Sequence, residues 1–390
     1  MEKTVLIIST GSFPYGPPRA IRLRAFMQIF EAIGWRVCVY SDDITGKDVG
    51  KEKTKFGNST LYSLGSQKVK LEKINIPFEF KKKLSEIVQL ENPRLIFSVC
   101  AYDRFSIITR CCKKYKIPLI IDSNEWYDPS TFRWGRLSWH YICHCICWRW
   151  FYPKANGAVV ISRLLEKHYK NLIANVIRIP TIVPELDDDY TIALNEDGKI
   201  RLLFAGSLAR TKDSIKPYFE ALNYLKKHKD CIQFEICGVS KNELEMHLGK
   251  QLYEKYKKQV HVYGRIPQEK IKEMYLRCNY GIFFRPDQRS SHAGFSTKLG
   301  EGMSTGTPFI INDTSDISLY IKSGKNGFIV KDRKDIAIVY EKLINMSMEE
   351  QQEMRFCARK TAETDFYYVS YIEAFKEFLE KIVDGEKNCE

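Results

Sequence analysis

The sequence contains no uncharged apolar run approaching the roughly 18–20 residues that a membrane-spanning helix requires. The opening stretch, MEKTVLIISTG, lacks the length and the small-residue cleavage site of a secretory signal, so we expect it to contain a first buried strand. We find no short internal repeat, no low-complexity tract and no recognition-helix, stacking-sheet or finger pattern. These absences argue against repeat architectures and against a nucleic-acid partner.

Paired metal ligands are missing as well. Four potential ligands crowd together in YICHCICW, namely Cys143, His144, Cys145 and Cys147. Zinc sites favour pairs spaced by about two to four residues and completed by a distant second pair, which this chain lacks, so we expect no metal site. The twelve cysteines fall mostly inside apolar segments, which is typical of buried thiols in a reducing cytoplasm.

The residues that are present indicate a folded protein of two domains. The chain has 390 residues, of which 44% are hydrophobic and 13% aromatic, enough for two full cores. Short apolar runs alternate with helical patterns in two series. The first series is Val5–Thr10, Arg36–Tyr40, Arg94–Val99, Pro118–Asp122 and Ala158–Ser162. The second is Ile200–Ala205, Ile232–Cys237, Val260–Tyr263, Tyr280–Phe284, Thr307–Ile311 and Gly327–Val330.

This alternation predicts right-handed βαβ units and therefore an α/β protein with two doubly wound, Rossmann-like domains. In such domains the carboxyl ends of the strands form the ligand-binding edge, so we expect the two edges to face a central cleft. We place the domains at 1–185 and 200–366, joined by a polar linker at 186–199. An amphipathic helix is expected in the last segment, 367–390.

Basic residues outnumber acidic ones by 61 to 48, a net charge of +13, which favours an anionic partner. Nine lysines lie between Lys51 and Lys83. Four of the six tryptophans are mixed with arginines in one short segment: Trp134, Trp139, Trp148 and Trp150 with Arg133, Arg136 and Arg149. Basic residues beside aromatics suit a lipid headgroup layer, which predicts peripheral contact with an anionic inner membrane. A solvated lysine-rich surface and an aromatic core helix are the alternative.

The segment Gly294–Ile310, GFSTKLGEGMSTGTPFI, is the most informative part of the chain. It predicts a turn of small residues, then a helix carrying Lys298 and Glu301, then a strand. Small and hydroxyl residues at a helix start leave backbone N–H groups that can face an anion, which the helix dipole also favours. Glu301, one turn further on, can accept hydrogen bonds from sugar hydroxyls. A diphosphate joined to a ribose fits both features; an ordinary αβ junction with a glycine cap is the alternative.

This segment resembles the signature of family 4 glycosyltransferases, retaining enzymes of the GT-B fold, in the form with Lys three residues before the Glu. The resemblance implies a nucleoside-diphosphate sugar as the donor. It also implies that the start of this helix binds the donor, through Phe295, Ser296, Thr297 and Lys298. In that family a final helix crosses back onto the first domain, which we expect for the helix within Tyr368–Val383.

A second match lies in FAGSLARTKDS. This stretch resembles the family's motif of a strand followed by Gly-Arg-Leu, three further residues and then a Lys. Gly206 and Lys212 fit the pattern, while Ser207 stands where the family has Arg. Arg210 is the expected substitute for that charge. In the family these cations grip the donor phosphates; an exposed lysine at a helix start is the alternative for Lys212.

The turn after the strand VHVYG is similar to the family's Gly-x-x-Pro turn, which lies against the nucleotide base. This similarity places Gly264, Arg265 and Ile266 in a base pocket. Arg285, which follows the strand YGIFF, is either a phosphate contact or a loop cation.

One position departs from the family pattern. Many members carry an acid eight residues before the position of Glu301, where this chain has Ala293. An alanine cannot hydrogen-bond a donor sugar, although members of the Lys-x-x-Glu form tolerate small residues there. His292 and Ser296 are candidates to replace part of its contacts.

In the first half, TGSFPYGPPRAIRLRAF resembles the family's first loop, which reaches towards the donor phosphates and the acceptor. Gly16 permits close backbone approach, and Arg19 and Arg22 lie near a helix N-terminus, where cations are disfavoured unless an anion is present. Glu125 follows the strand PLIID and is expected to orient the acceptor hydroxyl. Solvated arginines and a capping role for Glu125 are the alternatives.

The resemblance implies a cytoplasmic, hexosyl-type glycosyltransferase that transfers a sugar with retention to a lipid-linked or growing cell-surface glycan, at the inner face of a bacterial membrane. Lys212, helped by Arg210, would neutralise the leaving diphosphate, and Glu301 would hold the ribose. The sugar nucleotide is the substrate, and no metal or other cofactor is expected. Two alternatives stay open: a sugar-nucleotide epimerase of GT-B-like fold, and a non-catalytic partner subunit, which Ala293 makes credible.

Overall fold

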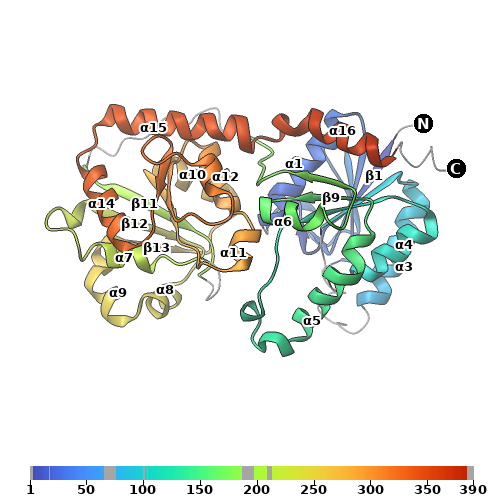
Figure 1. The fold of residues 1–390 in the computed structure, drawn as a ribbon, viewed down its shortest axis with the longest axis horizontal. Coiled ribbons are helices and arrows are strands. Elements are labelled where there is room, and N and C mark those ends of the chain that lie inside the picture. Colours follow the sequence, from blue (N-terminus) through green and yellow to red (C-terminus); the bar gives the residue numbers. More distant parts are fainter. Residues whose placement is uncertain are drawn as a thin grey trace. The chain divides into compact units, whose positions relative to one another are not determined.

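The computed structural model describes residues 3–16, 18–65, 76–99, 102, 104–186, 197–208 and 213–383. The chain divides into two compact units (Figure 1). The first unit comprises Met1–Pro184, Ala293–Phe295 and Tyr368–Glu390. The second comprises Glu185–His292 and Ser296–Tyr367.

The first unit is built on an eight-stranded sheet with the order β10-β9-β8-β7-β1-β3-β6-β5. All neighbouring strands are parallel except β5 and β6, which are antiparallel. The strands are β1 (Thr4–Ile8), β3 (Arg36–Ser41), β5 (Lys53–Phe56), β6 (Ser59–Ser63), β7 (Leu95–Val99), β8 (Leu119–Ser123), β9 (Gly157–Val160) and β10 (Asn175–Arg178). A separate pair joins β2 (Ser12–Phe13) to β4 (Asp43–Ile44). Every residue of β1, β7, β8 and β9 is buried, as expected for parallel strands covered on both faces.

The helices of this unit are α1 (Pro18–Ala32), α3 (Ile76–Glu91), α4 (Phe105–Tyr115), α5 (Trp139–Ile146), α6 (Arg163–Tyr169) and α16 (Ile372–Val383). Although α16 comes last in the sequence, it packs into the core of the first unit. The ring centroid of Phe375 lies 5.5 Å from that of Phe26 and 5.2 Å from that of Phe30, both on α1. Gly157 in β9 makes room for α16, because a Cβ there would lie 2.4 Å from Cδ1 of Ile382.

The second unit is built on a six-stranded, fully parallel sheet with the order β13-β12-β11-β14-β15-β16. Its strands are β11 (Ile200–Ala205), β12 (Ile232–Cys237), β13 (Val260–Gly264), β14 (Tyr280–Phe283), β15 (Phe309–Ile311) and β16 (Gly327–Ile329). Its helices are α7 (Lys216–Ala221), α8 (Lys241–Leu248), α9 (Lys250–Tyr256), α10 (Gln268–Arg277), α11 (Arg289–Ala293), α12 (Thr297–Ser304), α13 (Ile317–Tyr320), α14 (Arg333–Ile344) and α15 (Met348–Thr361). Two Rossmann-like halves are therefore present, as the sequence predicts.

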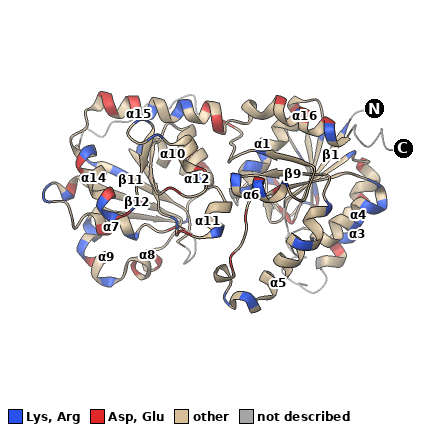
Figure 2. Cartoon of the chain, in the orientation of Figure 1, with Lys and Arg blue, Asp and Glu red and all other residues tan. Residues whose placement is uncertain are grey.

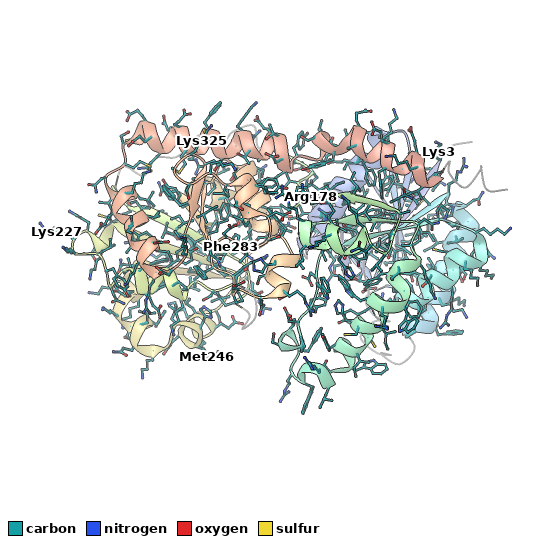
Figure 3. All side chains as sticks on the ribbon, viewed as in Figure 1. Lys3, Arg178, Lys227, Met246, Phe283 and Lys325 are labelled. Carbon is teal, nitrogen blue, oxygen red and sulfur yellow. The ribbon has the colours of Figure 1, made fainter. Side chains whose placement is uncertain are left out.

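Side chains fill the interior of each unit (Figure 3). Phe283 of β14 is fully buried, whereas Met246 on α8 and Lys325 lie at the surface of the second unit. Packing of this kind explains the apolar runs from which the strands were predicted.

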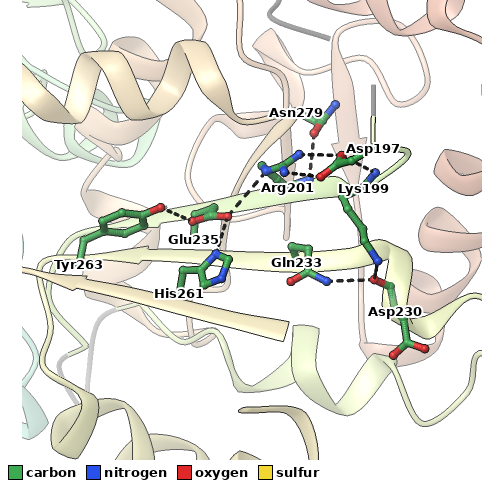
Figure 4. Close-up of polar contacts among 9 residues, drawn as sticks. All are labelled: Asp197, Lys199, Arg201, Asp230, Gln233, Glu235, His261, Tyr263 and Asn279. Carbon is green, nitrogen blue, oxygen red and sulfur yellow. Dashed lines mark hydrogen bonds and ion pairs between the residues drawn. The ribbon is translucent and has the colours of Figure 1, made fainter. Parts of the chain in front are cut away.

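One buried carboxylate ties three strands of the second unit together (Figure 4). Glu235 of β12 accepts a hydrogen bond from the hydroxyl of Tyr263 at 2.8 Å and lies 3.2 Å from Nδ1 of His261, both on β13. Nε of Arg201, on β11, is 3.9 Å away. Because a buried charge is costly unless it is paired, these partners make Glu235 part of the fold.

Each of the two large sheets has a point where the strand order reverses. In the second unit the chain starts at β11, adds β12 and β13 on one side and then adds β14, β15 and β16 on the other. The reversal therefore lies between β11 and β14; in the first unit it lies between β1 and β7. Open α/β sheets bind their ligands beyond the carboxyl ends of the strands at such reversals, so these are the places to look for sites.

Candidate functional site

A buried carboxylate and two cations meet at the reversal between β11 and β14. Asp213 is 3% exposed. Its Oδ2 accepts a hydrogen bond from Nζ of Lys298 at 2.6 Å, and its Oδ1 accepts one from Nε of Arg285 at 2.9 Å. Lys298 lies in the first turn of α12, and Arg285 follows β14. Two positive charges and one negative charge leave a formal charge of +1, which suits an anionic ligand.

The two cations control the ionisation of Asp213. Burial by itself raises the pKa of this carboxyl, but Lys298 and Arg285 outweigh burial and hold the pKa well below its usual range. Asp213 is therefore a carboxylate at any ordinary pH and keeps both cations in fixed positions.

Two hydrogen bonds to the side chain of Asn312 fix the backbone of Arg285. Its N–H donates to Oδ1 of Asn312 at 2.8 Å, and its carbonyl oxygen accepts from Nδ2 of Asn312 at 2.7 Å. Asn312 directly follows β15, so the loops after β14 and β15 are joined at the site.

Gly206 and Gly238 permit unusually close packing at the carboxyl ends of β11 and β12. Gly206 has φ +152°, and a Cβ there would lie 2.6 Å from Cε and 2.8 Å from Nζ of Lys298. Gly238 has φ +97°, and a Cβ there would lie 2.3 Å from the carbonyl oxygen of Gly206. Since neither position has room for a side chain, backbone and the Lys298 ammonium form this surface.

The N-terminus of α12 carries a second polar feature. Ser296 is the N-cap residue and is 2% exposed, but its Oγ makes no capping hydrogen bond. This oxygen has no hydrogen-bond partner among the residues that the structure describes. A buried hydroxyl without a partner costs free energy, and the first N–H groups of a helix also need partners, so this helix start is suited to a ligand with acceptor oxygens. Phe295 is buried and Thr297 is partly exposed beside it.

Glu301 lies one turn after Lys298 on α12 and is partly exposed. It is close to Tyr275 of α10: burial raises the pKa of the Tyr275 hydroxyl, and the Glu301 carboxylate raises it further. Because they are three residues apart, Lys298 and Glu301 lie on one side of α12. The lysine cation is nearer the start of the helix, and the glutamate, which can accept hydrogen bonds, is one turn further on.

The turn after β13 connects to the same edge of the sheet. The backbone N–H of Gly238 donates to the carbonyl of Gly264 at 2.7 Å, and that of Gly206 donates to the carbonyl of Cys237 at 2.9 Å. Arg265 is exposed and Ile266 is partly exposed in this turn. The structure thus brings Gly206, Gly264 and Lys298 to one edge, and Ser207 is exposed directly after Gly206.

Two predicted catalytic residues, Arg210 and Lys212, lie outside the described residues, so their roles stay predictions. The sequence did not single out Asp213 or Gly238. Both carry recognisable signals: Asp213 directly follows Lys212, and Gly238 follows β12 as Gly206 follows β11.

In the first unit, Arg22 does not fit the anion contact predicted for it. It is buried, and its Nε and Nη2 donate to the carboxylate of Asp122 at 3.0–3.2 Å. It also donates to the carbonyl oxygens of Ile179, at 3.0 Å, and Pro180. Its helix position misled the prediction, because a partner a hundred residues away neutralises its charge.

The other first-unit candidates are exposed or partly exposed. Arg19 is exposed and donates to the hydroxyl of Thr10 in the loop after β1, and Gly16 is exposed in the same loop. Glu125 lies two residues beyond β8 and hydrogen-bonds Tyr127. Burial raises the pKa of Tyr127, and Glu125 raises it further.

The two residues proposed to replace the missing acid differ in their availability. His292 is engaged at both ring nitrogens: Nε2 lies 2.6 Å from Oδ1 of Asp287, and Nδ1 accepts from the N–H of Ser315 at 3.3 Å. Ala293 is fully buried. Ser296, with its unpartnered hydroxyl, is therefore the better candidate.

The segment YICHCICW has the surroundings of a packed aromatic cluster. His144 is buried beside the rings of Tyr127, at 5.0 Å, and Trp148, at 5.5 Å. Cys145 is exposed, so the expectation of a buried thiol is wrong for this residue. Within the described ranges, no three His, Cys, Asp or Glu side chains are placed to share a metal ion. Of the helices in those ranges, none has the length and apolar character needed to cross a membrane.

Comparison with known proteins gives a family match over part of the chain. Residues 188–361 match the family model of glycosyl transferases group 1. Sucrose-phosphate synthase from Thermosynechococcus elongatus is similar in fold, with a TM-score of 0.74 at 14% identity over 98% of this chain and 100% of that one. No curated protein sequence matches the chain.

Two further solved structures share the fold. Anabaena HepE, in complex with UDP and glucose, gives a TM-score of 0.67 at 12% identity over 97% of this chain and 100% of that one. WaaG, a glycosyltransferase involved in lipopolysaccharide biosynthesis, gives a TM-score of 0.66 at 14% identity over 97% of this chain and 99% of that one. At these identities the likeness is one of fold, and it confirms the predicted GT-B architecture. Assignment to family 4 stays a prediction.

Proposed function

We propose that this chain is a retaining, hexosyl-type glycosyltransferase of family 4 that uses a nucleoside-diphosphate sugar. The observation that carries this proposal is the packing of Lys298 directly onto Gly206, at a sheet reversal within the residues that match the family model of glycosyl transferases group 1. A bare backbone, a cation and a helix start are the groups that bind a diphosphate. Structures of Anabaena HepE with UDP and with UDP-glucose share the fold, which supports this class of donor.

Each group has a role in this proposal. Lys298 and Arg285 balance the charge of the diphosphate as it leaves, together with Arg210 and Lys212. The Ser296 hydroxyl and the first N–H groups of α12 donate to phosphate oxygens. Glu301 accepts hydrogen bonds from the ribose, and the turn Gly264–Ile266 lies against the base.

The reaction breaks the bond between the anomeric carbon and a diphosphate oxygen, and the electron pair leaves with the diphosphate. The acceptor hydroxyl attacks from the same face, and its proton passes to the departing phosphate oxygen, so the configuration is retained. Protein cations and a helix terminus perform the charge neutralisation, so the proposal requires no metal. Ala293 fits this route, because same-face attack needs no carboxylate nucleophile.

The proposed acceptor is a lipid-linked or growing glycan at the cytoplasmic face of a bacterial inner membrane. Gly16, Arg19 and Glu125 of the first unit are the proposed acceptor-side residues, and all three lie just beyond strand ends or in the loop after β1. Arg22 is left out of this set because Asp122 holds it.

Thermal unfolding with UDP-, GDP-, ADP- and CMP-sugars tests the donor site. One nucleotide class is expected to raise the melting temperature, and Lys298→Ala, Lys212→Ala and Glu301→Ala should each remove that rise. Lys325→Ala, at an exposed position, is the matched control and should keep it. Retention of the full rise by all three site variants would show that the site is wrongly assigned.

A non-catalytic subunit is the second candidate, because Ala293 replaces an acid of the family pattern. Nucleotide release by the purified chain with donor alone, or with a lipid-linked acceptor, separates the two. Donor binding without any turnover would favour the subunit, whereas a changed sugar nucleotide without transfer would favour an epimerase.

A further inference from the structure

Helix α5 presents an apolar stripe to solvent. Trp139, Ile142, Ile146 and Trp150 are 70%, 38%, 41% and 60% exposed. Their spacing of three and four residues places them on one side of α5 and of the helical turn Cys147–Phe151 that continues it. The fold needs none of these side chains in its core, since other residues of the helix pack inward.

The inward side of the same helix is well packed. Trp148 is buried and stacks on Trp126 with ring centroids 4.4 Å apart, and His144 is buried beside it. The tryptophans of this segment therefore differ: Trp148 belongs to an aromatic core, whereas Trp139 and Trp150 are exposed. An amphipathic helix whose apolar stripe faces water marks an interaction surface.

Two further exposed apolar side chains lie in the turns just before α5. Trp134 is 71% exposed and Leu137 is 85% exposed. Together these residues form what we call the α5 surface: Trp134, Leu137, Trp139, Ile142, Ile146 and Trp150. Six exposed apolar side chains within residues 134–150 are more than the scattered single ones that ordinary surfaces carry.

The charged side chains of the segment that contains the α5 surface have one sign. No Asp or Glu occurs between Asp128 and Glu166, whereas Arg133, Arg136 and Arg149 are all exposed. Figure 2 shows blue and no red on the helix labelled α5 and its continuation. The guanidinium of Arg133 lies 5.8 Å from the ring centroid of Trp134, and that of Arg149 lies 5.6 Å from the ring centroid of Trp150. Each pair combines an amphipathic ring with a cation.

We propose that the α5 surface docks on an anionic phospholipid bilayer, with its rings and aliphatic chains in the headgroup layer and its arginines on lipid phosphates. Tryptophan favours this layer because its ring is apolar and its N–H is polar, and arginine is attracted to the negative surface. The helix lies on the membrane and does not cross it, since α5 is only eight residues long. The inference goes beyond the proposed function, because it does not depend on which reaction the second unit catalyses.

A second copy of the chain is a poorer occupant. In a two-fold dimer through this surface, Arg133, Arg136 and Arg149 would face the same arginines with no acidic residue of the segment to pair with them. Like charges across an interface oppose binding. An anionic lipid surface complements both the apolar and the charged parts.

Flotation of the whole chain with vesicles tests the proposal. Wild-type protein should float with vesicles of phosphatidylglycerol mixed with phosphatidylcholine, and bind pure phosphatidylcholine on the order of 100-fold more weakly. The variant Arg133→Gln/Arg136→Gln/Arg149→Gln should bind the mixed vesicles more weakly than wild type by about the same factor. The variant Trp134→Ser/Trp139→Ser/Trp150→Ser should bind them at least about 10-fold more weakly than wild type.

Matched controls lie on the second unit. Lys226→Gln/Lys227→Gln/Lys258→Gln removes the same charge from exposed positions, and Met246→Ser/Phe356→Ser removes exposed apolar side chains. Both controls should float like wild type, and all variants should keep the wild-type melting temperature because only exposed side chains change.

Three results would overturn the proposal. One is a wild-type chain that stays with the unbound fraction on both vesicles. Another is a control variant that loses as much binding as the α5 variants. The third is a concentration-dependent dimer that the tryptophan variant abolishes while no vesicle binds, which would assign the surface to a second copy.

Discussion

Lys298 lies directly against Gly206, so closely that a Cβ on residue 206 would come within 2.6 Å of the lysine Cε. One residue comes from the loop after β11 and the other from the start of α12, 92 positions further along the chain by their numbers. The contact places a cation over bare backbone, and it makes the glycine as necessary to the site as the lysine.

Gly206→Ala is therefore expected to push Lys298 out of its position. We expect donor affinity to fall by about 10- to 100-fold, the cost of one charge-assisted hydrogen bond. Isothermal titration with the sugar nucleotide found by thermal screening measures the change.

Gly249→Ala is the matched control for backbone strain. Gly249 also has positive φ, +84°, but a Cβ there has nothing within 4 Å. Both variants should lose stability from the strained conformation, by about 1–2 kcal/mol. Only Gly206→Ala should lose donor affinity, and an equal loss in both would attribute the effect to strain alone.

Strands β11 and β12 were predictable because each apolar run stops at a glycine, Gly206 after β11 and Gly238 after β12. The predicted bounds of β11 and β12, Ile200–Ala205 and Ile232–Cys237, are those of the structure. The hairpin β5–β6 was missed, since Lys53–Phe56 is a polar edge strand without an apolar run. Its one local signal is the Gly57-Asn58 turn, with φ +57° at Gly57.

The site was predictable only where a local motif carries it. Gly206, Ser296 and Lys298 belong to such motifs and meet at one edge of the sheet. The position of Asp213 directly after Lys212 is a signal that it belongs to the site. Its role was not predictable, because that role depends on Arg285 and Lys298, which are 72 and 85 residues away in sequence. A single sequence has no local pattern that reports such contacts.

Arg22 and Asp122 provide a test of a buried ion pair in the first unit. Both side chains are almost fully buried, at 2% and 1% exposure. Arg22→Met should destabilise the chain by about 3–5 kcal/mol, because it leaves a buried carboxylate without its cation. Urea denaturation measures the loss.

The double variant Arg22→Met/Asp122→Leu should recover most of that stability, since no unpaired charge remains. Arg94→Met, at an exposed position, should change stability by less than about 0.5 kcal/mol. Donor-induced stabilisation should persist in every variant that folds. If only Arg22→Met lost it, Arg22 would have to be counted among the anion-binding residues.

The cysteines should differ sharply in reactivity. Burial raises the pKa of the Cys111 thiol to about 11, only partly offset by Lys114, so almost no thiolate exists at pH 8. Cys145 is exposed. Alkylation of the native chain at pH 8, followed by peptide mass mapping, should modify Cys145 within minutes and leave Cys111 largely intact. Equal modification of both would mean that the α4 helix opens readily.

Asp213 makes the stability of the second unit depend on pH with a defined sign. Its folded pKa lies below that of the unfolded chain, so the unfolded state takes up the proton first as pH falls. The ion pairs therefore stabilise fully above the ordinary carboxyl pKa of about 4, and this contribution declines as pH falls below that value. Asp213→Asn removes the charge at every pH and should cost roughly 3 kcal/mol at pH 7.

Urea denaturation of both chains between pH 7 and pH 3 measures this dependence. The difference in unfolding free energy should be flat from pH 7 to about pH 5 and then shrink, because the wild-type carboxylate loses its advantage while the amide is unaffected. Asp230→Asn, at an exposed position, should show a small difference that does not vary in this way. The difference in unfolding free energy between wild type and Asp213→Asn would contradict this account if it stayed constant down to pH 3. Packing, and not the charge held between Lys298 and Arg285, would then account for the lost stability.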